Sequence, residues 1–419
     1  MRALIISNKN PLAGNDGGSL GILNVLKGYR SVGIDITLLT MNPLKHYIPI
    51  EQVKSQIEQT GIEVIDYKID TNINYLKLIW NLIASRLPYN LERFYDKKFR
   101  ELIIKEVSNN KYDFIQLESS FVGMYVDAIR EINPQIPIYL RAHNVEYEIW
   151  ELNSKSAKNL AKKIYFKIIA RRLKKFESIL FNKVDIVLSI TELDTKLIKL
   201  LSPNANVHIL PFPIEVMKYP YFPINSSDAN QQHQKNDNPD ISFAYLGSLN
   251  WIPNQEGLTW FIDKVWKKLS EEFPMIKFYI AGKNPPDNLK NKLRSKNVIF
   301  LGEIADAKEF IASHPIFIVP LFAGSGVRVK IIEQMAMGRI IISTSLGAES
   351  IDIRNGINGF IANTPDEFIN IIRRIIDNEF NLEEISKNAR KYIESTFDSE
   401  QIFKEFASFL NSNNIKKNY

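Results

Sequence analysis

The feature that most constrains the fold of this chain is a succession of short apolar segments. Longer segments, several of them with a helical pattern, separate these short ones. Most of the short segments are unbroken runs of Ile, Leu and Val, without a polar residue at every second position. This pattern is typical of parallel strands that helices cover on both faces. The expected strands comprise residues 3–7, 34–40, 63–69, 114–118, 138–142, 186–190 and 207–211, and after a polar break residues 241–246, 277–281, 298–301, 316–321, 340–344 and 359–362.

The two series of strands indicate two α/β domains, and the chain length agrees. At 419 residues the chain is too long for a single ordinary core. Residues 223–240 are rich in Asn, Gln, Ser and Asp and offer almost nothing to bury, which predicts a solvated linker. We therefore expect an N-terminal domain at 1–222 and a C-terminal domain at 241–395. Helical patterns fill the gaps between the strands, for example at 20–32 and 91–107, and the closing segment 382–410 also has a helical pattern.

Composition excludes several classes of protein and site. The chain has no cysteine, which rules out disulfides, thiolate metal sites and cysteine nucleophiles. It begins with an expected strand rather than a signal peptide, and it has no apolar segment of about 20 residues that would span a bilayer. We therefore expect a cytoplasmic location. The formal net charge of +6 is modest, so the position of the charges matters more than their sum.

The segment with the most candidate functional residues follows the expected strand 316–321. This strand ends in a small-residue turn at 323–326, and the expected helix after it carries Arg328, Lys330 and Glu333. Backbone N–H groups of such a turn, together with the positive end of a helix dipole, favour an anion. The two cations add to this, and a diphosphate would use all three features. Because the carboxylate is placed to accept hydrogen bonds from sugar hydroxyls, the segment predicts a nucleotide-sugar site.

Other turns supply backbone for the same ligand. Gly247 and Ser248 follow the first strand of the second series, and a further glycine turn follows the strand at 340–344. The complete set of donor-binding candidates is Gly247, Ser248, Gly324, Ser325, Gly326, Val327, Gly347, Ala348 and Glu349. An alternative remains open for the charged residues, since Lys330 and Glu333 have the spacing of an ordinary i,i+3 pair on a solvated helix.

Several motifs of other nucleotide-binding or sugar-transferring proteins are missing from the sequence. It contains no G-x-G-x-x-G in a first strand-to-helix turn and no G-x-x-x-x-G-K-[ST] loop, which argues against a dehydrogenase or a P-loop ATPase. It also has no Asp-x-Asp pair to hold a divalent cation on a diphosphate. We therefore expect no metal ion and no cofactor, with the phosphates neutralised by the protein's own cations.

The N-terminal half offers two weaker candidates, each with a structural alternative. Gly17 and Gly18 lie between the first strand and a helix, where a turn lets a ligand approach the backbone; alternatively, Asp16 or Ser19 simply caps that helix. His143 follows the strand at 138–142, at the edge of an open sheet where ligands bind. It is equally compatible with a structural histidine that bonds to a neighbouring loop.

Residues 155–175 contain nine Lys or Arg and no acidic residue, with apolar residues at helical spacing. A basic amphipathic helix can lie on an anionic membrane surface. Alternatively, its apolar stripe packs on the N-terminal sheet while the cations face water. Nucleic acid is not an expected partner, because one basic helix without a recognised module is weak support.

Taken together, these stretches resemble the retaining glycosyltransferases of family 4, which have the GT-B fold. The pattern PL-x-x-G-x-G-x-R-x-K-x-x-E-x-M-A-x-G is met from Pro320 to Gly338. RAHNVE at 141–146, GSLNWIPN at 247–254 and NGF at 358–360 agree as well. Ser325 stands where the commoner family pattern has the first of two glutamates, and Glu333 matches the second.

The resemblance implies an α/β protein of GT-B architecture, with two facing Rossmann-like domains, parallel sheets and a cleft between them. It implies that the terminal segment 396–419 packs back on the N-terminal domain. It also implies that His143 and Asn144 face the transferred sugar, that the loop with Gly17 and Gly18 lies on the acceptor side, and that Arg328 and Lys330 act on the donor diphosphate.

The implied function is transfer of a sugar from a nucleotide donor to a hydroxyl of a glycan or lipid-linked acceptor, with retention of configuration, in the synthesis of a cell-surface polysaccharide or glycoconjugate. The expected catalytic residues are His143, Arg328, Lys330 and Glu333. Two alternatives remain: a nucleotide-sugar epimerase of the same fold, and a non-catalytic nucleotide-sugar-binding partner of a transferase, to which the Ser325 position lends weight. The expected location is the cytoplasm, at the inner face of the cell membrane if the basic helix makes the contact described above.

Overall fold

A computed structural model of the chain describes residues 1–12, 16–57, 61–224, 242–324 and 326–415. The chain divides into two compact units. One comprises Met1–Ile214 together with Ser399–Tyr419, and the other comprises Glu215–Asp398. Residues 225–240 of the expected linker lie outside the described residues.

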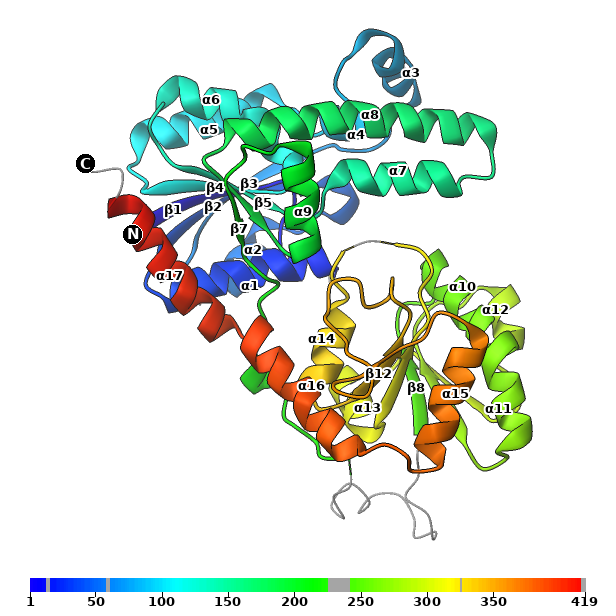
Figure 1. The fold of residues 1–419 in the computed structure, drawn as a ribbon. Helices are drawn as coiled ribbons and strands as arrows, with labels where there is room; N and C mark the ends of the chain where they lie inside the picture. Colours follow the sequence, from blue (N-terminus) through cyan, green and yellow to red (C-terminus); the bar gives the residue numbers. More distant parts are fainter. Residues whose placement is uncertain (13–15, 58–60, 225–241, 325, 416–419) are drawn as a thin grey trace. The chain divides into compact units, whose positions relative to one another are not determined.

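In the described part of the N-terminal unit, seven parallel strands form one sheet in the order β3-β2-β1-β4-β5-β6-β7 (Figure 1). Chain order reverses between β1 and β4, which pair directly, as in a doubly wound Rossmann-like sheet. The strands are β1 (Arg2–Ser7), β2 (Asp35–Pro43), β3 (Glu63–Ile69), β4 (Phe114–Glu118), β5 (Ile138–Ala142), β6 (Ile186–Ser189) and β7 (Val207–Ile209).

The second unit repeats this topology. Its described residues form a six-stranded parallel sheet in the order β10-β9-β8-β11-β12-β13, with the reversal between β8 and β11. The strands are β8 (Ser242–Leu246), β9 (Lys277–Ala281), β10 (Val298–Gly302), β11 (Ile316–Val319), β12 (Ile340–Ser343) and β13 (Phe360–Ile361). The expectation of two α/β halves with parallel sheets is therefore confirmed.

Helices connect the parallel strands, as crossovers must. Those of the N-terminal unit are α1 (Gly17–Ser31), α2 (Ile50–Ile57), α3 (Tyr75–Ala84), α4 (Tyr89–Glu92), α5 (Lys97–Asn109), α6 (Val126–Ile132), α7 (Glu146–Ser156), α8 (Leu160–Lys183), α9 (Glu192–Leu201) and α17 (Ser399–Ile415). Those of the second unit are α10 (Ile252–Phe261), α11 (Lys267–Glu272), α12 (Asp287–Lys292), α13 (Ala307–Ser313), α14 (Val329–Ala336), α15 (Pro365–Ile376) and α16 (Leu382–Phe397). Short turns of other helix types are η1 (Leu44–His46), η3 (Ser120–Tyr125), η4 (Val216–Lys218) and η6 (Ile262–Trp266).

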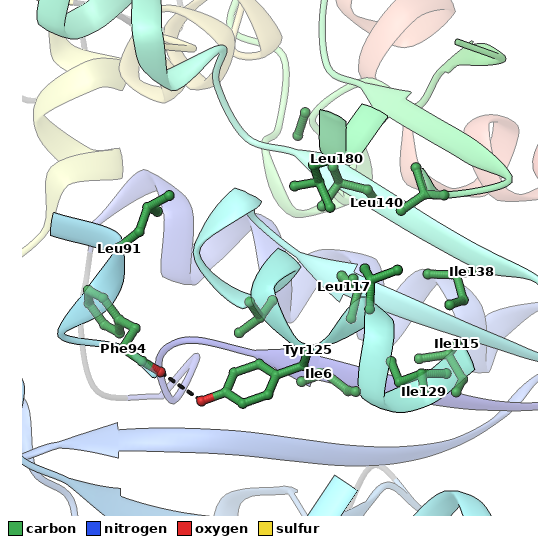
Figure 2. Packing of buried hydrophobic residues seen from close by; sticks show 14 of the residues in the cluster. Ile6, Leu91, Phe94, Ile115, Leu117, Tyr125, Ile129, Ile138, Leu140 and Leu180 are labelled. Carbon is green, nitrogen blue, oxygen red and sulfur yellow. Dashed lines mark hydrogen bonds between the residues drawn. The ribbon is translucent and has the colours of Figure 1, made fainter. Parts of the chain in front are cut away.

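The unbroken apolar runs are explained by a core on each face of the sheet. In β1, Leu4 and Ile6 belong to one cluster of buried residues, while Ala3 and Ile5 belong to another on the opposite face. Figure 2 shows the first cluster, in which the Tyr125 hydroxyl donates to a backbone carbonyl at 2.8 Å. Because every residue of such a strand is covered, the sequence shows no polar alternation.

The last helix packs against the first helix of the N-terminal unit, and the two lie side by side in Figure 1. Phe403 of α17 and Tyr29 of α1 meet edge to face, with ring centroids 5.3 Å apart. A Cβ atom on Gly28 would lie only 1.9 Å from the Phe403 ring. A glycine at this position therefore permits the close approach of the two helices.

Three predicted helices are wrong in their continuity, because polar residues restart the helix within each predicted range. Residues 91–107 span the end of α4 and most of α5, which begins where Asp96 accepts hydrogen bonds from Lys98 and Phe99 amides. Residues 155–175 span the end of α7 and the start of α8, where Asn159 accepts from the Lys162 amide at 3.1 Å. The segment 382–410 divides at Asp398, whose extended backbone separates α16 from α17.

Candidate active site

The predicted donor residues gather at one edge of the second sheet. Gly247 and Ser248 follow β8, and the glycine turn at 323–326 follows β11, two neighbouring strands on either side of the topological reversal. Ligands of open α/β sheets bind beyond the carboxyl ends of the strands at such a reversal. The sheet topology thus brings together two segments that lie about 75 residues apart in the sequence.

The turn after β11 depends on its glycines. Gly324 has φ of +103° and Gly326 has φ of +84°, a backbone conformation that residues with a side chain rarely adopt. The predicted donor residue between them, Ser325, lies outside the described residues. Helix α14 then begins at Val329, one residue later than its first cation, and Arg328 occupies the N-cap position.

Arg328 is buried, with 8% of its surface exposed. Its guanidinium carbon lies 5.9 Å from the centre of the Trp251 ring, which also packs against the glycine turn. Burial lowers the pKa of Arg328, and the carboxylate of Glu349 acts in the opposite direction. Glu349 itself is exposed. Two predicted donor residues from separate turns are therefore close enough to interact electrostatically.

Lys330 lies against β8. Its ammonium group donates to the Leu246 carbonyl at 3.4 Å and lies 4.8 Å from the centre of the Tyr245 ring. Burial, and to a lesser extent the positive charge of Arg328, lowers the pKa of Lys330 to about 7. Two like charges are thus held near each other in a poorly hydrated place, where an anion would relieve the cost of both.

Glu333 has a partner that the sequence did not predict. The Tyr219 hydroxyl donates to its carboxylate at 2.8 Å, and the Lys308 ammonium lies 4.8 Å from the centre of the Tyr219 ring. Burial raises the pKa of Glu333, although the Tyr219 hydrogen bond and the Lys308 charge counteract it. Lys330 and Glu333 thus have different partners, which does not favour the alternative of a simple i,i+3 pair.

The backbone amides of the second glycine turn serve that turn itself. The Gly347 amide donates to the Thr344 hydroxyl at 3.0 Å, and the Ala348 amide donates to the Thr344 carbonyl at 3.0 Å. The Glu349 amide donates to the Leu346 carbonyl at 3.4 Å. The Gly247 amide likewise donates to the Ala281 carbonyl of β9 at 3.1 Å. These amides therefore shape the edge of the site through internal hydrogen bonds.

In the N-terminal unit, His143 lies just beyond β5, beside the end of β4. Its Nε2 atom is 2.5 Å from Oε2 of Glu118, and Nη1 of Arg141 is 3.5 Å from the same oxygen. Neither Glu118 nor Arg141 exposes any side-chain surface, whereas His143 exposes 13%. The histidine is therefore the member of this cluster that contacts solvent.

Electrostatics favour an ionised Glu118 beside a neutral imidazole. Burial would raise the pKa of Glu118, but the Arg141 charge and the His143 hydrogen bond outweigh it, and the pKa lies below its ordinary value. Burial lowers the pKa of His143, and Glu118 only partly compensates. The Nε2–H of a neutral imidazole then donates to the carboxylate.

The remaining N-terminal candidates are at the starts of helices. Gly17 and Gly18 form the first turn of α1, and Asp16 caps that helix by accepting from the Ser19 amide at 3.1 Å. This is the capping arrangement that the sequence left open as an alternative. Asn144 lies in the short connection between β5 and α7.

Sequence reasoning missed four residues that support these sites: Glu118, Arg141, Tyr219 and Tyr245. Glu118 and Arg141 lie at the carboxyl ends of two expected strands, a position that offered a usable signal. Tyr219 is 114 positions from its glutamate, and nothing local in the sequence connects the two. Within the described residues, no group of three or more His, Cys, Asp or Glu could hold a metal ion.

Comparison with known proteins identifies the second unit. Residues 240–378 match the family model for group 1 glycosyl transferases. This match falls within the C-terminal unit. The glycine turn, Arg328, Lys330 and Glu333 all lie in the matched segment.

Similarity to individual proteins extends over nearly the whole chain. An uncharacterised 44.6 kDa protein in the cps region of Klebsiella pneumoniae is 26% identical over 424 residues, covering 96% of this chain and 98% of that protein. Anabaena HepE in complex with UDP has a TM-score of 0.69 at 15% identity, covering 98% of this chain and 100% of HepE. HepE in complex with UDP-glucose gives a TM-score of 0.64 at 15% identity, over 98% of this chain and 99% of that one.

A further structural neighbour is the lipopolysaccharide outer core galactosyltransferase WaaB in its apo form. Its TM-score is 0.63 at 15% identity, and the match covers 100% of both chains. At this level of identity the structural likeness establishes the fold alone. The N-terminal and C-terminal Rossmann-like units together have the GT-B fold.

Proposed function

We propose that the chain transfers a sugar from a nucleoside diphosphate sugar to a hydroxyl group of a glycan or lipid-linked acceptor. The observation that carries this proposal is the pair of Arg328 and Lys330, two neighbouring cations in the segment that matches group 1 glycosyl transferases, whose pKa values are lowered by burial. Glu349 offsets part of the cost of burying Arg328, and a bound anion would offset it for both cations. A diphosphate, with two charged phosphates a few ångströms apart, is the anion that matches them.

The same pair explains how the bond to the leaving group is broken. As the glycosidic bond breaks, negative charge accumulates on the departing diphosphate and positive charge on the anomeric carbon. Arg328 and Lys330 are held in place by Trp251, the Tyr245 ring and the Leu246 carbonyl before the donor arrives. Preorganised charges of this kind stabilise the transition state without reorganisation during the reaction.

Other residues complete the proposed site. Glu333, held by Tyr219, would accept hydrogen bonds from hydroxyls of the nucleoside ribose. His143 would contact the transferred sugar through its exposed side, with Glu118 fixing its orientation. We further propose that the protein's cations take the place of a metal ion on the diphosphate and that the anomeric configuration is retained. The first follows from the missing Asp-x-Asp pair, and the second from the family resemblance.

The donor and the biological setting are also proposals. HepE binds UDP and UDP-glucose, which makes uridine nucleotides the first donors to test. The Klebsiella pneumoniae relative in a cps region favours a role in surface polysaccharide synthesis. A cytoplasmic location remains an expectation from the sequence.

Nucleotide binding provides the direct test. We expect UDP to raise the melting temperature of the wild-type protein, because a ligand that binds only the folded state stabilises it by mass action. The double variant R328A/K330A should lose this shift and most sugar transfer. The matched control is R294A/K296A, which removes the same charges at two exposed positions of the same unit. Equal UDP shifts in both double variants would refute the proposed role of the pair.

Product analysis separates the alternatives. A transferase releases nucleoside diphosphate only when an acceptor is present, and NMR of the product reveals whether configuration is retained. An epimerase converts the donor sugar without any acceptor. A non-catalytic partner binds the donor but yields neither product across a panel of acceptors.

A further inference from the structure

Helix α3 exposes an apolar face that no part of the described chain covers. Tyr75, Leu76, Ile79, Trp80 and Ile83 are 75%, 79%, 55%, 68% and 79% exposed. At about 100° per residue, these five side chains occupy an arc of about 140° on one side of the helix. The exposed face of α3 is therefore continuous, and it contains large apolar side chains with a single tryptophan.

The other side of α3 packs on the unit through Asn81, which is fully buried, and through Leu78 and Leu82, which are half-buried. The Asn81 amide donates to the Leu87 carbonyl at 2.9 Å and to the Glu92 carboxylate at 2.6 Å. An ordinary surface helix exposes a polar side, whereas α3 has apolar side chains on its exposed side as well. The uncovered apolar side chains indicate that the outer face of α3 meets an apolar environment outside the protein.

The helix is held firmly in this orientation. At its start the Asn74 side chain caps the helix by accepting from the Lys77 amide at 3.0 Å, and the Asn74 amide donates to the Tyr89 hydroxyl at 2.8 Å. At its end, Arg172 of α8 donates to the Asn81 carbonyl and side chain, both at 3.1 Å, and to the Leu82 carbonyl at 2.8 Å. The exposed apolar face thus belongs to a helix whose two ends are both tied to the unit.

Helix α8 extends the same surface. Leu160, Ile164 and Ile168 are 72%, 53% and 38% exposed, and they lie four residues apart in a row that continues to Arg172. The row drifts about 40° around the helix axis at each step, so its Ile168 end lies nearest the contact of Arg172 with α3, while Leu160 lies about 120° around α8 from Arg172. Figure 1 shows α3 and α8 next to each other. The row is about 18 Å long at 1.5 Å per residue.

Cations border this apolar surface on α8, and acids are missing from both segments that form it. Lys163, Lys167 and Arg171 are exposed beside the row on α8, and Lys162 is exposed on another side of the same helix. Residues 155–175 contain nine Lys or Arg without an Asp or Glu, and residues 71–91 contain no Asp or Glu either. An apolar surface bordered by positive charge is complementary to a bilayer with anionic head groups.

We propose that α3 and the N-terminal half of α8 form a docking surface for an anionic lipid bilayer. The apolar face of α3 enters the interface, with Trp80 at the level of the head groups, while the cations of α8 bind lipid phosphates. A second copy of the chain is a poorer occupant, because the two sets of cations would repel each other. No helix among the described residues is long and apolar enough to span a membrane, and the proposed contact does not require one.

Vesicle flotation of the full chain tests the proposal, independently of sugar transfer. We expect the protein to float with phosphatidylcholine–phosphatidylglycerol vesicles, and to bind vesicles of phosphatidylcholine alone about tenfold more weakly. The variant L76S/W80S/I83S should bind the anionic vesicles at least about tenfold more weakly. Its matched control, L200S/M217S/M275S, replaces three apolar residues elsewhere that are exposed to a similar or greater extent and should bind like the wild type.

The charge contribution and the depth of insertion are measured separately. K162Q/K163Q/K167Q should lose most of the salt-sensitive binding, whereas K264Q/K267Q/K296Q, with the same charge loss on exposed sites of the other unit, should retain it. Brominated acyl chains should quench tryptophan fluorescence in the wild type and much less in W80F, which keeps an apolar side chain.

Three results would overturn the proposal: no binding to either kind of vesicle, equal losses in the variants and their matched controls, or quenching that is unchanged in W80F. A fourth result would assign the surface to a second copy of the chain instead. In that case, light scattering would show a dimer in the wild type and a monomer in L76S/W80S/I83S, with vesicle binding unaffected by the substitutions.

Discussion

The imidazole of His143 and the carboxylate of Glu118 form a close pair, with Nε2 of the histidine 2.5 Å from Oε2 of the glutamate. Arg141 keeps the carboxylate ionised, and the carboxylate in turn fixes the imidazole proton on Nε2. The Nδ1 atom of His143 is then the nitrogen left to accept a hydrogen bond from a ligand. A buried carboxylate thus determines which atom of a partly exposed histidine is available.

Replacing Glu118 by glutamine should change catalysis more than donor binding. The neutral amide no longer fixes the imidazole tautomer, so we expect kcat to fall about tenfold or more, with the KM for the donor little changed. Because Glu118 raises the pKa of His143 against the effect of burial, this pKa should fall further in E118Q. Proton NMR titration of the His143 ring measures the shift.

Stability provides the control for this variant. Removing one partner of a buried ion pair costs on the order of 3–5 kcal/mol, since Arg141 is left without its carboxylate. Urea unfolding shows whether E118Q remains folded under assay conditions. H143N leaves the Arg141–Glu118 pair intact and should reproduce the loss of kcat without a comparable loss of stability. An unaltered kcat in both variants would exclude the positioning role.

We expect Lys330 to take up a proton when a nucleotide binds. Its pKa of about 7 should rise toward the ordinary value when a diphosphate neutralises the neighbouring charges. At pH 8 the free protein carries this lysine mostly neutral, so binding of UDP should take up close to one proton, and affinity should fall as the pH rises above 7. Calorimetry in buffers of different ionisation enthalpy counts the protons. K330R should bind without uptake, whereas K296R should behave as the wild type; uptake that persists in K330R would contradict the prediction.

We expect the ionisation of Glu177 to lower the stability of the protein between acid and neutral pH. It is fully buried, accepts hydrogen bonds from the Glu146 and Tyr147 amides at 3.0 and 2.9 Å, and burial raises its pKa to about 7. A raised pKa in the folded state stabilises the protein fully below the ordinary value of 4.5, and this stabilisation disappears as the pH rises through 7.

The variant E177Q does not titrate, but its single side-chain oxygen can accept from only one of the two amides, which bond to different carboxylate oxygens in the wild type. We expect its free energy of unfolding to change less than that of the wild type between pH 5 and pH 8. The exposed control E101Q should retain the wild-type pH dependence. Urea titrations at the two pH values decide, and parallel pH profiles for E177Q and the wild type would contradict the assignment.

At the contact of α1 with α17, we expect a substitution of Gly28 to cause a steric clash that a second substitution relieves. G28A places a methyl group where the Phe403 ring lies, and overpacking of this kind typically costs about 1–3 kcal/mol. Shortening the ring side chain in G28A/F403L should recover part of this loss, because the methyl group then has room. Denaturant unfolding of the two single variants and the double variant measures the coupling. Strictly additive effects would indicate that the two residues do not contact each other.

Much of the fold could be predicted because strand identity is a local property. The strands at 63–69, 114–118, 138–142 and 277–281 have the bounds that the apolar runs predicted. Helix ends were harder to predict. The interruptions at Asp96 and Asn159 depend on side chains that bond to the backbone, which hydrophobic spacing does not register.

The candidate site also has a part that the sequence predicts and a part that it does not. Arg328, Lys330 and Glu333 lie within six residues, so the sequence alone places them on one strand–turn–helix unit. Their partners come from distant segments: Tyr219 holds Glu333, and Trp251 and Tyr245 lie against the cations. Their burial, and with it the direction of each pKa shift, depends on these segments.

The sequence by itself determined the two α/β halves, their parallel strands and the local clustering of charge beside a glycine turn. All of these follow from spacing between near neighbours. Only the tertiary structure decided which side chains are buried together and which faces remain uncovered. The spacing of α3 shows that Tyr75, Ile79 and Ile83 share a face, but whether a face is covered depends on the rest of the fold, because burial is a property of three-dimensional packing.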